Sequence, residues 1–157
     1  MTINKQRRKV IKSVAAGAAA STLPLPFISR SGFASDPIVL GMPIAQSTAG
    51  GVADHLDHLQ GAILAQEEIN AAGGILGREL KLKVVDIDIF SPEGCQTAMH
   101  KLVDEKVHAM TTPFTLAPIP TIDATVKYKA PLLWGVTQRN YTDHVAAHPD
   151  KYSHCFQ

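Results

Sequence analysis

Residues 61–80, GAILAQEEINAAGGILGREL, decide the fold. Apolar residues in this stretch and in the turn before it recur three and four apart, which predicts an amphipathic helix. The apolar stripe comprises Leu56, Leu59, Ala62, Ile63, Ala65 and Ile69, while Glu67, Glu68 and Asn70 fall on the side expected to face solvent. Gly73 and Gly74 then supply the left-handed backbone that commonly ends a helix. Because Leu80 opens a strand, the stretch predicts a helix–turn–strand unit of an α/β layer.

Strands and helices alternate along the rest of the chain. Ile38–Met42 is a short apolar run typical of a parallel strand buried on both faces. From Leu80 to Val84, apolar residues alternate with lysines, which indicates a strand with one exposed face near the sheet edge. Ser91-Pro92-Glu93 combines a capping hydroxyl, a proline and an acid at a helix start. We then expect a strand at Val107–Thr111, a helix from about Ala117, a strand at Pro131–Gly135, and a fifth strand starting within Tyr152–Gln157. This order predicts an α/β, flavodoxin-like open parallel sheet with helices on both faces.

The first 34 residues have the composition of an export signal. Arg7 and Arg8 lie in a basic segment, and an alanine-rich apolar run follows from about residue 14 to residue 25. Small residues at positions 32 and 34 favour cleavage after Ala34. The arginine pair resembles a twin-arginine signal, and an ordinary secretory signal is the alternative. We therefore expect residues 1–34 to direct export to the periplasm and residues 35–157 to form the mature domain.

Without the signal the chain is acidic. Residues 35–157 contain nine basic and 14 acidic residues, a net charge of −5, whereas the whole chain carries +1. An acidic domain without a basic cluster is a poor candidate for binding nucleic acid. Pro24 and Pro26 interrupt the apolar run well below the ~20 residues that a membrane span needs, so we expect no stable membrane insertion. Cys95 and Cys155 could form a disulfide in an oxidising compartment, but we favour two unpaired, buried thiols.

Three loops are candidates for ligand binding, because ligands of open α/β sheets bind beyond the carboxyl ends of the strands. They cover residues 43–51, 112–117 and 136–142. The second loop runs into a helix N-terminus, which favours an anionic group such as a carboxylate. Each polar residue could instead cap its own loop. The candidate ligand-binding residues on or beside these loops are Thr48, Asp54, Thr115, Leu116, Thr137, Gln138 and Arg139.

Other chemical patterns are weaker. His55 and His58 could offer two metal ligands beside Asp54 and Asp57, but a solvated helix start explains the same residues, so we predict no metal. Asp86 and Asp88 could form a carboxylate pair, although a solvated strand end is the simpler interpretation. The glycines at 73–77 follow a helix and precede a strand, the reverse of the order that a phosphate loop needs. Trp134 is expected in the core. We expect no catalytic residue and no cofactor.

The sequence EEINAAGGILGR at residues 67–78 closely resembles the first helix and turn of type I periplasmic substrate-binding proteins, the branched-chain-amino-acid-binding class of ABC importers. The resemblance extends over Pro37–Gln157. In that family the loops after strands one, three and four hold the amino-acid backbone of the solute. This chain has Phe114-Thr115-Leu116 where the family is serine-rich, and Val136–Arg139 where the family has a run of small residues. Asp54 stands where branched-chain binders carry an aromatic, so a more polar or differently charged solute fits at least as well.

The resemblance implies an exported solute-binding component of an ABC importer rather than an enzyme. It would capture an amino acid, amide or small carboxylate between two lobes by hinge closure and deliver it to the membrane permease. Because family members have two lobes, we expect this chain to be a truncated or fragmentary product that represents the N-terminal lobe only. The alternative function is a small Tat-exported, cofactor-binding enzyme on a flavodoxin-like sheet.

Overall fold

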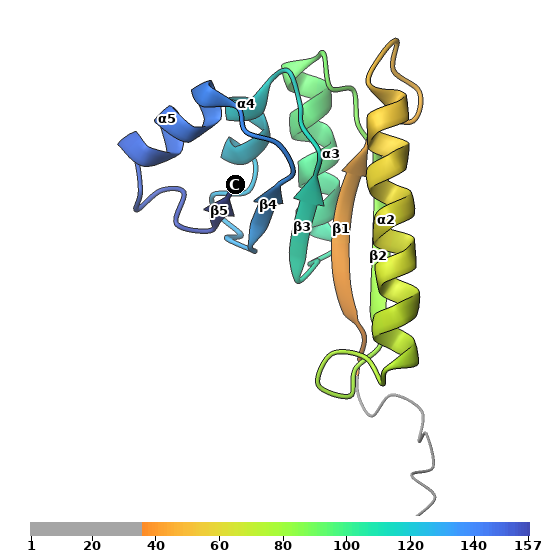
Figure 1. Ribbon diagram of the computed structural model, residues 1–157. Helices are drawn as coiled ribbons and strands as arrows, with labels where there is room; N and C mark the ends of the chain where they lie inside the picture. The colour runs from red at the N-terminus through yellow and green to blue at the C-terminus, as the bar shows by residue number, and fades with distance from the viewer. Residues whose placement is uncertain (1–35) are drawn as a thin grey trace, which may run out of the picture. The chain divides into compact units, whose positions relative to one another are not determined.

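The computed structural model describes residues 36–157, which form a five-stranded parallel sheet in the order β2-β1-β3-β4-β5 (Figure 1). The predicted export signal, with Arg7, Arg8 and cleavage after Ala34, lies outside the described residues. In chain order the elements are β1 (Ile38–Ile44), α2 (Val52–Ala71), β2 (Leu80–Asp86), α3 (Pro92–Asp104), β3 (Ala109–Thr112), α4 (Pro118–Asp123), β4 (Leu132–Trp134), α5 (Arg139–Ala147) and β5 (Cys155–Phe156). The flavodoxin-like strand order confirms the predicted fold class.

The turn between α2 and β2 closes as the sequence indicates. Gly73 and Gly74 both have positive φ, and the Gly74 amide donates to the Ile69 carbonyl at 2.9 Å. Asn70, which we expected to face solvent, is half-buried instead. Its side-chain amide donates to the Leu80 carbonyl at 2.9 Å, and its Oδ1 accepts from the Leu80 amide at 2.8 Å. Asn70 therefore fixes the last turn of α2 to the first residue of β2.

Helix α2 covers β1 and β2, on the opposite face of the sheet from α3 (Figure 1). Its apolar stripe is less buried than the periodicity predicts, because Leu56 and Ala65 are exposed and His55 is the only fully buried residue of this helix. Leu133 of β4 and Phe156 of β5 are register partners and are also exposed. The described residues thus leave part of one sheet face uncovered.

The largest hydrophobic cluster lies where α3, α4 and α5 meet the sheet. Its buried members include Met99, Leu102, Met110, Ile122, Leu132, Trp134 and Tyr141. The position of Trp134 confirms the core assignment. The start of α3 is also as predicted, since the Gly94 amide donates to Ser91 Oγ at 3.0 Å. Both cysteines are free, buried thiols, as we favoured.

The structure differs from the sequence prediction most at β3 and after β4. Strand β3 begins at Ala109, two residues later than predicted. Helix α5 was not predicted at all, because Gln138 is a poor helix cap and few apolar residues follow it; Tyr141 is the only fully buried residue of this helix. Within residues 36–157, no helix is long and apolar enough to cross a membrane.

Candidate functional site

The candidate site lies at the carboxyl ends of the strands, where three loops meet. We name them the first loop (residues 45–51, after β1), the second loop (113–117, after β3) and the third loop (135–138, after β4). From β1 the chain crosses to β2 on one side, whereas β3, β4 and β5 follow on the other. The first and second loops therefore flank the topological switch point, where open α/β sheets form their ligand crevice.

Asp86, at the end of β2, holds the first loop. Its Oδ1 accepts from the Gln46 amide at 2.8 Å, and its Oδ2 accepts from the Ser47 hydroxyl. The hydrogen bond from Ser47, helped by nearby backbone amides, lowers the pKa of Asp86. Asp86 is exposed, as expected of a strand end, yet its carboxylate anchors a loop rather than only facing solvent. Ser47 and Thr48 also line a pocket of about 380 Å³ together with Ala49, Asp88 and Phe90.

His55 lies behind the first and second loops and is fully buried, which corrects its assignment to a solvated helix start. Its Nδ1 accepts from the Ala45 amide at 3.1 Å, and its ring lies edge-on to Phe114, with centroids 5.0 Å apart. His58, by contrast, is directed at Thr111 Oγ1, 3.2 Å from its Nε2. The two histidines therefore have separate partners. Among residues 36–157, no group of three or more His, Cys, Asp or Glu side chains is arranged to hold a metal.

Gln138 connects the third loop to the second. Its Oε1 accepts from Trp134 Nε1 at 2.5 Å, and its Nε2 donates to the Thr115 carbonyl at 2.9 Å. The Thr115 hydroxyl is buried and paired with Thr121 Oγ1 at 3.0 Å. The structure thus brings Gln138 and Thr115 together, but the Thr115 hydroxyl is hydrogen-bonded to Thr121 inside the fold.

The other candidate residues lie at the rim. Asp54 is exposed in the first turn of α2, and Leu116 and Thr137 are exposed in the second and third loops. Thr48 is half-buried, and its hydroxyl donates to the Gly50 carbonyl at 2.8 Å. Arg139 was placed in a loop by the sequence but is the first residue of α5. Its side chain is exposed and lies 3.4 Å from Asp143.

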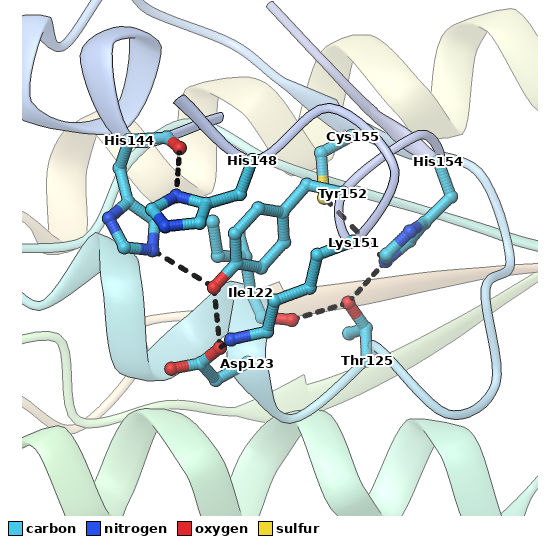
Figure 2. Close-up of polar contacts among 9 residues, drawn as sticks. All are labelled: Ile122, Asp123, Thr125, His144, His148, Lys151, Tyr152, His154 and Cys155. Carbon is cyan, nitrogen blue, oxygen red and sulfur yellow. Dashed lines mark hydrogen bonds and ion pairs between the residues drawn. The ribbon is translucent and has the colours of Figure 1, made fainter. Parts of the chain in front are cut away.

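A polar cluster away from these loops connects α4, α5 and the segment before β5, as Figure 2 shows. The Tyr152 hydroxyl donates to Asp123 Oδ1 at 2.6 Å and lies 2.9 Å from His144 Nε2. Lys151 Nζ contacts the same carboxylate oxygen at 2.6 Å. Burial alone would raise the pKa of Asp123, but the hydrogen bonds from Lys151 and Tyr152 outweigh burial, so the pKa is lowered. Asp123 ends α4, and helices of a parallel sheet end near the amino ends of the strands, so we interpret this cluster as structural.

Replacing Tyr152 with phenylalanine is expected to lower the free energy of unfolding by about 1–2 kcal/mol, because a buried hydroxyl with two partners is lost. Tyr141→Phe is the matched control. Tyr141 is equally buried, but its hydroxyl makes a longer hydrogen bond of 3.4 Å to the Phe156 carbonyl. Tyr141→Phe should therefore lower the free energy of unfolding by less than Tyr152→Phe. Chemical denaturation of both variants measures the difference. Equal losses would contradict a special contribution from the Asp123 cluster.

The part of the chain that builds these loops matches a known protein family. A family model described as periplasmic binding protein matches residues 37–149, which include β1 to α5. The chain belongs to the periplasmic binding protein family. No curated protein sequence shows significant similarity to the chain.

Solved structures agree with this family. A proposed branched-chain amino acid ABC transporter from Silicibacter pomeroyi is 27% identical, with a TM-score of 0.71; the match covers 78% of this chain and 31% of that protein. LivJ, the branched-chain amino acid transporter substrate-binding protein of Streptococcus pneumoniae solved with isoleucine, is 30% identical, with a TM-score of 0.58. That match covers 69% of this chain and 31% of LivJ. The chain therefore spans less than a third of either solved protein.

Membership of the periplasmic binding protein family confirms the resemblance found in the sequence. The family and its solved relatives are substrate-binding proteins, which are not enzymes. Burial raises the pKa of Cys95 and raises that of Cys155 to about 11. Protonated, inaccessible thiols make poor nucleophiles. The sequence did not reveal the roles of Asp86 and His55, because we considered Asp86 only as half of a carboxylate pair or a solvated strand end, and His55 only as a metal ligand or a solvated helix residue.

Proposed function

We propose that the chain is the N-terminal lobe of an exported solute-binding protein and that its three loops form one wall of the solute site. The observation that carries this proposal is the arrangement of the loops at the switch point. Asp86 holds the first loop, and Gln138 bonds the third loop to the second. Such internal anchoring suits a binding surface, because a preorganised site loses less conformational entropy when the solute binds.

We propose an amino acid or a similar small polar solute. The complex of LivJ with isoleucine supports an amino acid, and the exposed carboxylate of Asp54 is suited to an ammonium group. Thr137 and the half-buried Thr48 could add hydrogen bonds from the first and third loops. Arg139, at the start of α5, would contact a carboxylate or a polar side chain only after leaving Asp143.

The wider function follows from the family. A second lobe would close over the solute by a hinge motion, and the closed form would be the one recognised by the permease of an ABC importer. The basic segment with Arg7 and Arg8 supports export to the periplasm, by the twin-arginine route in our proposal.

Isothermal titration of the 157-residue chain with isoleucine, with amides and with small carboxylates tests the proposal. We expect at least one of these solutes to bind. In a separate thermal-denaturation measurement the same solute should raise the melting temperature, by an amount that grows with the logarithm of its concentration above Kd. Asp54→Asn should weaken that binding about tenfold, the effect of losing about 1.4 kcal/mol. Asp57→Asn is the matched control, because Asp57 is an exposed acid on the same helix but outside the proposed residues. Since the chain supplies only one wall of the site, we expect this binding to be weak, so the titration extends to high solute concentrations. Equal affinities of the two variants would contradict the role of Asp54, and absence of binding by the unmodified chain at those concentrations would contradict the proposed function.

A further inference from the structure

His55 differs from the other candidate residues because it contacts two of the loops from inside the fold. It lies in α2 and is fully buried. Its Nδ1 accepts the amide of Ala45, the first residue after β1, and its ring edge meets Phe114 of the second loop at an interplanar angle of 66°. Its other nitrogen, Nε2, has no hydrogen-bond partner among the described residues. One side chain thus fixes the base of the first loop and packs against the second.

The contact with Ala45 determines where the proton of the ring lies. A nitrogen that accepts a hydrogen bond carries no proton, so neutral His55 has its proton on Nε2. A second proton would go to Nδ1, where it would face the Ala45 N–H and replace an acceptor with a donor. The hydrogen bond between α2 and the first loop therefore exists only with the neutral ring.

The surroundings of His55 favour that neutral ring. Burial lowers its pKa below the usual 6.5; the Phe114 backbone and Asp54 act in the opposite direction, and His58 adds to the lowering. On the neighbouring elements, Asp86 is bound to Gln46 and Ser47. Asp88 follows β2, and Cys95 of α3 is a buried thiol in the cluster that includes Ala45. Because the folded pKa lies below the unfolded one, the stabilisation is complete above about pH 6.5 and is lost as the pH falls through the folded pKa.

We propose that His55 is a positioning residue whose neutral imidazole holds the first and second loops in the arrangement needed for solute binding, and whose protonation releases them. This inference rests on the proposed solute site. If protonation of His55 releases the loops, solute binding should weaken at acidic pH although His55 does not contact the solute.

Two substitutions of His55 separate its hydrogen bond from its bulk. In His55→Asn, Oδ1 occupies the position of Nδ1 and accepts from Ala45 without titrating near neutral pH. In His55→Leu, the volume is largely kept but the acceptor is lost. His58→Asn is the matched control on the same helix, since His58 contacts Thr111 rather than the loops. For each full-length protein, hydrogen exchange gives the protection factor of the Ala45 amide at pH 7 and at pH 5.

We expect protection of Ala45 in the unmodified chain and in His58→Asn to fall between pH 7 and pH 5. It should be independent of pH in His55→Asn, and about tenfold lower at pH 7 in His55→Leu, consistent with loss of one hydrogen bond. Titration with isoleucine should show the same pattern in affinity. Equal protection of Ala45 in His55→Leu and the unmodified chain would overturn the inference, whether or not isoleucine binds. Failure of the unmodified chain to bind any of the tested solutes would instead overturn the proposed function.

Discussion

Replacing Leu102 with alanine is expected to lower the free energy of unfolding by about 2–5 kcal/mol, one of the two largest effects that we predict. Leu102 is a fully buried residue of α3 and belongs to the main hydrophobic cluster. It fills the space left by Gly41 of β1, where an added Cβ would lie 3.1 Å from Leu102 Cδ2 and 2.9 Å from Val107 Cγ2. Removing the side chain would therefore open a cavity between α3 and the middle of the sheet.

Leu64→Ala is the matched control for Leu102→Ala. It makes the same chemical change in a helix, but Leu64 is 59% exposed, so its loss should stay within about 0.5 kcal/mol. Urea denaturation followed by circular dichroism measures both values. Losses of similar size would contradict the placement of Leu102 in the core.

The architecture could be predicted from the sequence because it follows from local patterns. Helical periodicity and the glycine pair predict the end of α2, and Ser91-Pro92-Glu93 predicts the start of α3. Alternation of apolar residues with lysines predicts that β2 is an edge strand, as the strand order confirms. Helix α5 lacks such signals. It follows a residue that makes no side-chain cap and buries little apolar surface.

The position of the three candidate loops in the fold could be predicted from the sequence, but the contacts of their side chains could not. The switch-point rule selects the three loops from strand order alone. Which side chain faces inward depends on partners that are distant in sequence, as the contact of His55 with Phe114 illustrates. Likewise, the hydroxyl of Thr115, which we predicted from the sequence as a ligand donor, is hydrogen-bonded to Thr121. A periodicity argument contains no information on such pairings.

Gly51→Ala is the second substitution for which we expect a large loss in the free energy of unfolding, about 2–5 kcal/mol. Gly51 precedes α2 with φ of 74°, and a left-handed conformation costs a residue with a Cβ about 1–2 kcal/mol. The added Cβ would also lie 2.7 Å from Ile89 Cδ1 and 3.3 Å from Phe114 Cζ. Because Ile89 is buried, its methyl group has little room to move, and such overpacking typically costs a further 1–3 kcal/mol.

Gly77→Ala separates the two causes. Gly77 has almost the same φ, 75°, but a Cβ there would meet no heavy atom within 4 Å. Gly77→Ala should therefore lower the free energy of unfolding only by the cost of the left-handed backbone, about 1–2 kcal/mol. The difference between the two variants in the free energy of unfolding, from chemical denaturation, measures the packing of Gly51 against Ile89 and Phe114.

Since Phe114 also contacts His55, Gly51→Ala should displace the second loop and reduce the hydrogen-exchange protection of the Ala45 amide. Gly77→Ala should leave that protection unchanged. Equal effects of the two variants on stability and on protection would mean that the space beneath the first loop is not tightly packed.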